Sequence, residues 1–131
     1  MNRKNQQELI NKYPNLFINV DKSPTESLMC FGLECGEGWF NLIDETCSEI
    51  QKTLNGRKLK FTQIKEKYGG LRIYTNYYIE DIDNILDEAE DKSFEICEEC
   101  GSKENVKITE TGWIYTRCET CMKKLKEKGL I

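Results

Sequence analysis

Residues 97–121 read CEECGSKENVKITETGWIYTRCETC. Two Cys-x-x-Cys pairs stand at the ends of this stretch, with seventeen residues between them. Each pair suits a tight backbone knuckle that holds two sulfur atoms about 2.3 Å from one ion, and two such pairs roughly 15–20 residues apart are a recognised zinc spacing. We therefore expect one structural Zn²⁺ ion bound by four thiolates, from Cys97, Cys100, Cys118 and Cys121.

The residues between and after the cysteine pairs predict the shape of the metal-binding segment. Residues 106–110 and 113–116 are strand-like and flank a Thr111-Gly112 turn, and MKKLKEKG after the last cysteine reads as a short basic helix ending at Gly129. Knuckle, hairpin and helix in this order predict a treble-clef-like zinc finger, with a plain zinc ribbon as the alternative. Ordinary buried cysteines are a second interpretation, and a Cys-x-x-Cys redox motif, which explains only one pair, is a third. Four thiolates leave no open position for water, so the ion is expected to stabilise the fold.

The chain upstream of the cysteines predicts an α-ββ-α domain over residues 1–96, followed by the finger over 97–131. The helices are expected at 3–12, 39–54 and 79–93, and the two strands at 59–66 and 71–78. Residue periodicity supports both types of element, because the helical segments repeat apolar residues every three to four positions and the strands alternate. The strands are joined through Lys67-Tyr68-Gly69-Gly70, whose glycines supply the positive φ of a tight turn. The expected fold class is α+β, with the helices at 39–54 and 79–93 on one face of a small antiparallel sheet.

Composition excludes several function classes. The 131-residue chain contains no histidine, which removes Ser-His-Asp and Cys-His catalysis and histidine-ligated catalytic zinc. Its formal charge is −4, and four zinc-bound thiolates would make it about −6, which opposes non-specific binding to nucleic acid. Neither a secretory signal nor a membrane span is recognisable, and seven cysteines without such a signal favour metal ligation over disulfides. We expect a soluble intracellular protein.

The three cysteines outside the pairs have simpler interpretations. Cys47 falls on the apolar stripe of the helix at 39–54 and is expected in the core. Cys30 and Cys35 are candidates for a second metal site, but no fourth soft ligand lies near them in sequence, so a structural or free state is the alternative. Trp39 is expected to be a core residue.

A basic hairpin stands beside an acidic helix in this sequence. Residues 57–72 carry six basic side chains against one acid, a balance of +5, and residues 80–95 carry a balance of −7. In one interpretation these are solvated faces that partly neutralise each other. In the other, the hairpin is a binding surface for an anionic partner, with Lys, Tyr and Arg supplying charge, stacking and bidentate contacts. Its candidate residues are Gln63, Lys65, Lys67, Tyr68 and Arg72.

Four sequence blocks resemble a family of small proteins encoded by bacteriophages and prophages. The blocks are KYPNLF (12–17), ECGEGWFNLIDETCSEIQ (34–51), QIKEKYGGLRIY (63–74) and CEECG with the final cysteine pair. The resemblance covers most of the chain, and the two middle blocks are its most specific part. It carries no particular activity. It implies a setting, the bacterial cytoplasm during infection or lysogeny, where small accessory proteins often bind a component of the host.

Three functional hypotheses follow. The first is a non-enzymatic zinc-containing accessory protein that binds a host protein or a nucleotide-like anion through the basic hairpin, for example to inhibit host defence or regulation. The second is a nucleic-acid-binding zinc finger that uses Arg117, Lys123, Lys124, Lys126 and Lys128. The third is a histidine-independent hydrolase, for which Glu34, Glu37 and Asp44 are the carboxylate candidates.

Overall fold

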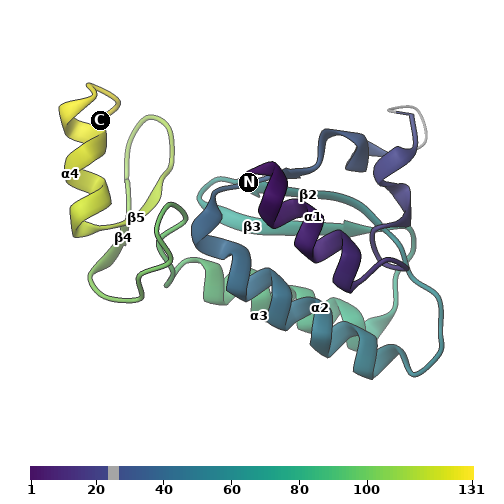
Figure 1. Ribbon diagram of the computed structural model, residues 1–131. Helices are drawn as coiled ribbons and strands as arrows, with labels where there is room; N and C mark the ends of the chain where they lie inside the picture. Colours follow the sequence, from purple (N-terminus) through teal and green to yellow (C-terminus); the bar gives the residue numbers. More distant parts are fainter. Residues whose placement is uncertain (24–26) are drawn as a thin grey trace.

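The computed structural model describes residues 1–23 and 27–131 (Figure 1), and it is an α+β fold as predicted. The α-helices of the described residues are α1 (Arg3–Lys12), α2 (Phe40–Leu54), α3 (Glu80–Ser93) and α4 (Glu119–Glu127). The strands are β1 (Leu33–Glu34), β2 (Phe61–Lys67), β3 (Gly70–Thr75), β4 (Val106–Ile108) and β5 (Thr116–Cys118). Short 3₁₀ helices form η1 (Ile18–Asp21), η2 (Leu28–Phe31) and η3 (Glu37–Trp39).

The helices predicted at 3–12, 39–54 and 79–93 are all present as α1, α2 and α3. Helix α2 buries the apolar stripe that its sequence predicts, and Asn55, with φ +47°, ends it in the left-handed conformation typical of a helix terminus. Helices α2 and α3 pack against each other and run side by side along the sheet, and α3 contacts β3 directly. Trp39 and Cys47 are both fully buried, as predicted.

The main sheet has a third strand that the sequence analysis missed. Its order is β1-β2-β3, with β1 parallel and β3 antiparallel to β2. A register irregularity between Phe61 and Gln63 acts as a β-bulge, which lets Phe61 enter the core although Gln63 faces the other way. Beyond the bulge Gln63 pairs with Tyr74 and Lys65 pairs with Arg72, so these four side chains share one face of the sheet.

The turn between β2 and β3 differs from the predicted Gly-Gly turn. Tyr68 (φ +53°) and Gly69 (φ +84°) are its two central residues, and Gly70 is already the first residue of β3. Gly70 is needed for a different reason: a Cβ atom at this position would lie 2.6 Å from Cζ of Phe94. Strand β3 consequently starts one residue earlier than predicted and ends at Thr75, three residues before the predicted end.

The C-terminal segment contains the predicted order of knuckle, hairpin and helix, and it lies at one end of the main domain (Figure 1). Its hairpin is shifted from the prediction, since β5 covers Thr116–Cys118 and Val106 pairs with Cys118. Helix α4 begins at Glu119, so Cys121 belongs to its first turn. The predicted treble-clef-like finger therefore describes the segment better than the alternative, a plain zinc ribbon. Within residues 1–23 and 27–131, no helix combines the length and the apolar character needed to cross a bilayer.

Candidate metal centre and the adjoining hairpin

The four paired cysteines come together in one compact cluster. All four sulfur atoms lie within 4.8 Å of one another, and Sγ of Cys100 is 3.6 Å from Sγ of Cys118. A tetrahedral ion with metal–sulfur bonds of about 2.3 Å needs sulfur atoms about 3.8 Å apart, so this spacing fits a four-thiolate site. Cys97, Cys118 and Cys121 are buried and Cys100 is exposed. The cluster can hold a metal ion.

The first knuckle, residues 97–102, directs backbone N–H groups at its sulfur atoms. The N–H of Cys97 donates to the carbonyl of Ser102 (2.8 Å), and the N–H of Gly101 donates back to the carbonyl of Cys97 (2.9 Å). Burial raises the pKa of the Cys97 thiol, but hydrogen bonds from the backbone N–H groups of Cys100 and Cys118 outweigh it and lower the pKa to about 7. The fold therefore favours a thiolate at Cys97, which is the form that binds a metal.

At Cys100 and Cys121, by contrast, the neighbouring thiols raise the pKa. The N–H of Ser102 lowers the pKa of Cys100, but burial and the adjacent thiols of Cys118 and Cys97 raise it further than that. Burial raises the pKa of Cys121, and the thiols around it raise it again. Several sulfur atoms this close cannot all carry charge without a cation between them. A divalent ion would supply that charge, and its binding would release the protons.

Two glycines of the ECGEGW block hold the knuckle against the main domain. The N–H of Gly38 donates to the carbonyl of Glu98 (2.7 Å), and the N–H of Gly36 donates to the Glu98 carboxylate (2.9 Å). A Cβ atom on Gly38 would lie 2.6 Å from the Gly101 nitrogen and would overlap the carbonyl oxygen of Cys97. Neither Gly36 nor Gly38 has a positive φ, so close backbone approach is what requires a residue without a side chain here.

Glu98 is the buried centre of this contact. Only 8% of its surface is exposed, and besides accepting from Gly36 it lies 3.0 Å from the guanidinium of Arg117. Arg117 also stacks on the ring of Tyr115, with its Cζ 5.2 Å from the ring centroid. Arg117 is thus engaged inside the finger, which weakens the nucleic-acid hypothesis that counted it as a phosphate contact. Of the four lysines in that hypothesis, Lys123 lies 3.6 Å from Glu119, one helical turn earlier.

The finger also supports the turn between β2 and β3. The buried hydroxyl of Thr116 donates to the carbonyl of Gly69 (2.6 Å), and a Cβ atom on Gly69 would lie 2.9 Å from Cγ2 of Ile114. The N–H of Glu98 completes this contact by donating to the carbonyl of Thr116 (3.1 Å). The metal-binding segment and the tip of the basic hairpin are therefore one packed unit.

The basic hairpin is partly neutralised by α3, as the first interpretation predicts. Arg72 lies 3.0 Å from Glu90, and Arg57 lies 3.1 Å from Asp81 while it also caps the carbonyl groups at the end of α2. Within the described part of the chain, Lys65 and Lys67 make no ion pair. Tyr68, in the turn that follows them, is 72% exposed, and the ammonium of Lys67 lies 5.7 Å from its ring centroid. The predicted binding residues therefore remain available except for Arg72.

The cysteines at 30 and 35 do not form a second metal site. In residues 1–23 and 27–131, the four-cysteine cluster is the one group of three or more metal-binding side chains. Cys30 is exposed, whereas Cys35 is buried, and burial raises its pKa to about 12. Both are free thiols, which is the alternative that the sequence left open.

The three carboxylates of the hydrolase hypothesis do not converge. Glu37 accepts hydrogen bonds from Asn2 and Asn5 at the start of α1. Asp44 accepts from the hydroxyl of Tyr13 and from Lys12, whose Nζ lies 3.0 Å away. Glu34 is an exposed residue of β1. Glu37 and Asp44 thus have structural roles at the start and at the end of α1, respectively.

No known family matches the chain, and comparison with curated proteins and with solved structures finds no match either. The function must therefore be inferred from the residues themselves. The contacts that the sequence analysis missed are those of Gly38 and Glu98. A signal for them existed, since Gly36 and Gly38 stand next to a helix start and not in a predicted turn.

Proposed function

We propose that this protein is a zinc-stabilised binding protein, without catalytic activity of its own, which recognises an anionic partner through the tip of the β2–β3 hairpin. The tip surface consists of Gln63, Lys65, Lys67 and Tyr68. The phage resemblance favours a bacterial host protein, or a nucleotide-like anion of the host cell, as the partner. The finger then acts as a support that fixes the tip.

Zinc is the proposed ion because of the donor set. Four cysteine thiolates at tetrahedral spacing are typical of structural zinc, and iron–sulfur sites are the main competitor for the same ligands. The experiment is metal analysis with native mass spectrometry on protein purified under reducing conditions from bacteria. We expect one zinc per chain and a colourless protein, and Cys100→Ser to lose the ion while Cys30→Ser keeps it. Protein that contains no zinc, or one iron per chain, would refute the assignment of zinc.

The observation that supports the binding surface is the contrast between paired and free cations. Arg57 and Arg72 are held by acids of α3, whereas Lys65 and Lys67 lie on β2 next to a tip that the finger holds in place, and Lys67 lies over the ring of the exposed Tyr68. Lysines and an aromatic ring at a fixed position suit an anionic group. Packing alone gives no reason for this arrangement, because the tip carries none of the core.

The test reverses these two charges. The variant Lys65→Glu with Lys67→Glu is compared with Lys124→Glu with Lys126→Glu, which makes the same charge change on α4. Probes are ATP, an eight-residue polyglutamate peptide and a single-stranded oligonucleotide, titrated by calorimetry at two salt concentrations. We expect the hairpin variant to lose about tenfold or more in affinity, about 1.4 kcal/mol, with little change in thermal midpoint. Equal affinities of the hairpin variant and the wild type would remove this surface, and loss in the α4 variant alone would favour the nucleic-acid alternative.

A further inference from the structure

Strand β3 is an edge of the main sheet and has backbone groups directed away from it. Because Tyr68 and Gly69 form a two-residue turn, Lys67 and Gly70 are the closing pair of the hairpin, and the ladder alternates from there. Leu71, Ile73 and Thr75 then direct their N–H groups away from β2. The N–H of Leu71 confirms this alternation, since it donates to the hydroxyl of Ser93 in α3 (2.9 Å).

Within the described residues, no backbone or side-chain hydrogen bond from a neighbouring element reaches the main chain of Ile73, further along β3. An edge with unpaired main-chain groups is a template for another strand. The unpaired part of the edge, around Ile73, lies nearer the start of α3, whereas Leu71 lies beside the end of that helix.

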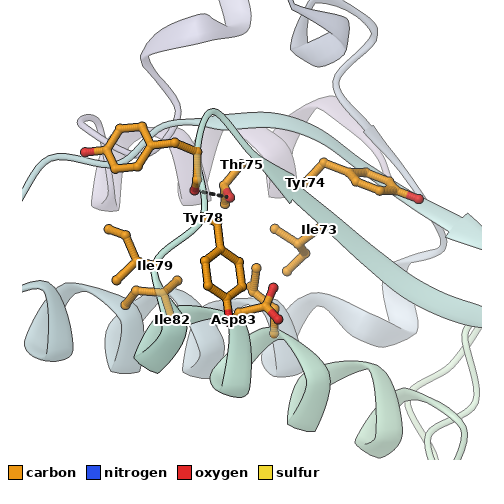
Figure 2. Close-up of a pocket in the computed structure, with 9 residues that line it drawn as sticks. Ile73, Tyr74, Thr75, Tyr78, Ile79, Ile82 and Asp83 are labelled. Atoms are coloured by element: carbon orange, nitrogen blue, oxygen red, sulfur yellow. Dashed lines mark hydrogen bonds between the residues drawn. The ribbon is translucent and has the colours of Figure 1, made fainter.

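An apolar slot opens beside this part of the edge. Its volume is about 240 Å³, below the range of about 300–1,000 Å³ that holds a small-molecule ligand, so it suits a single large side chain. Figure 2 shows Ile73 and Ile82 facing the slot from β3 and α3, while Tyr78 descends from the linker toward α3 near Asp83. Tyr74 points away from it. Tyr78 lines the slot and is 71% exposed, so its ring is accessible to an incoming side chain.

The helix that forms the floor of the slot supplies negative charge. Asp83, Asp87 and Glu90 are spaced by four and three residues, so they lie along one face of α3. Glu90 is held by Arg72 of β3, which places this face toward the strand edge. Asp83 lines the slot itself, and neither Asp83 nor Asp87 has an ion-pair partner in the part of the chain that the structure describes. A basic partner would meet these charges as it enters.

We propose that the free edge of β3 binds an extended segment of a partner protein, which adds as a strand and places a large apolar side chain in the slot. Lysine or arginine residues two positions before and after that side chain would lie on the same face and approach Asp83 and Asp87. A second copy of this chain is the less favourable occupant, because pairing two β3 edges brings two acidic helix faces together. The site is separate from the hairpin tip and needs neither Lys65 nor Lys67.

The probe is a fluorescent heptapeptide, Thr-Lys-Thr-Leu-Thr-Lys-Thr, which puts leucine and both lysines on one face. Controls are the same peptide with glutamate for lysine, with alanine for leucine, and with alternate backbone nitrogens methylated to block strand pairing. We expect saturable binding in fluorescence anisotropy at low salt, loss of at least tenfold for every control peptide, and slowed amide exchange at Ile73 and Thr75. No binding up to about 1 mM protein, which corresponds to about −4 kcal/mol, would overturn the proposal.

Two neighbouring substitutions test the charge requirement. Asp87→Lys and Glu88→Lys make the same change at adjacent exposed positions of α3, but only Asp87 lies on the face toward β3. We expect Asp87→Lys to weaken peptide binding about tenfold and Glu88→Lys to change it less than about twofold. Equal effects of the two variants would contradict the proposal, as would undiminished binding of the methylated peptide or a dimer in native mass spectrometry that the peptide does not dissociate. The Lys65→Glu, Lys67→Glu variant should bind the peptide normally, so this test and that of the hairpin tip fail independently.

Discussion

Gly38→Ala tests whether the metal-binding segment depends on close backbone contact with the main domain. The added Cβ atom would lie 2.6 Å from the nitrogen of Gly101 and would overlap the carbonyl oxygen of Cys97. Both neighbours are backbone atoms of the first knuckle, so no flexible side chain can move aside. The knuckle would have to shift as a whole, away from Gly38 and from the loop that holds it.

The expected cost has two parts. Forcing a methyl group into a tightly packed contact costs about 1–3 kcal/mol. The shift also breaks the hydrogen bonds from Gly38 and Gly36 to Glu98, each worth about 1 kcal/mol. The sum is about 3–5 kcal/mol. Gly112→Ala is the matched control in the same finger, because φ there is +71° but nothing lies within 4 Å of the new atom, so only about 1 kcal/mol of backbone strain is expected.

The measurement is thermal unfolding of zinc-loaded protein by circular dichroism, together with a zinc-affinity titration. For a chain of this size, 1 kcal/mol shifts the midpoint by about 3–5 °C. Gly38→Ala should therefore lower the midpoint by about 10–20 °C and weaken zinc binding, whereas Gly112→Ala should lower it by about 3–5 °C. If the thermal midpoint of Gly38→Ala equals or exceeds that of Gly112→Ala, the close contact between the knuckle and the domain does not stabilise the fold.

Two further predictions concern the thiols and one buried hydrogen-bond network. In zinc-loaded native protein only Cys30 should react rapidly with a thiol reagent at neutral pH. Chelation of the zinc should raise the number of reactive thiols from one to about five, because burial protects Cys35 and Cys47 and raises the pKa of both. Rapid reaction of more than one thiol before chelation would contradict zinc binding by the cluster. Burial raises the pKa of Asp44, but hydrogen bonds from Tyr13 and Lys12 outweigh it and lower the pKa below its ordinary value of 3.8. A depressed pKa stabilises the fold above the unfolded value, and the benefit is lost as pH falls through the folded one. Asp44→Asn should therefore cost about 1 kcal/mol in urea unfolding at neutral pH, and the cost should shrink as the pH falls below 3.8. A cost that stays constant over this pH range would refute that role.

The predictable parts of the fold are those whose signal is local. Helices α1, α2 and α3 lie within one residue of their predicted limits, because the spacing of apolar residues along a helix acts over a few positions. Strand β1 escaped prediction because two residues in a parallel pair carry no period of their own. The bulge at Phe61 escaped prediction because that ring packs against Phe17, 44 positions earlier, and a contact over this separation leaves no local pattern in the sequence.

In the candidate site, too, the features with a local signal in the sequence were predictable and those formed by distant residues were not. The clustering of Cys97, Cys100, Cys118 and Cys121 was predicted from spacing alone, because each knuckle is a local structure. Arg72 was a candidate for partner binding, but it pairs with Glu90 of α3. The opposite charges of the two segments had predicted some neutralisation without indicating which residues would pair. Contacts between backbone atoms, such as those of Gly38, leave no mark in side-chain chemistry. Only the absence of a side chain at an unexplained position can indicate them.

The position of these contacts explains why the glycine blocks and the cysteine pairs occur in one chain. The ECGEGW block supplies the N–H groups that hold Glu98, one residue after the first cysteine of the cluster. The KYGG turn supplies the carbonyl that accepts from Thr116, two residues before the third cysteine. Each block thus meets the metal-binding segment within two residues of a cysteine, where a bound ion would restrict the backbone most. An ion bound by the four cysteines would therefore stabilise the segment that receives both contacts, and through it the position of the hairpin tip.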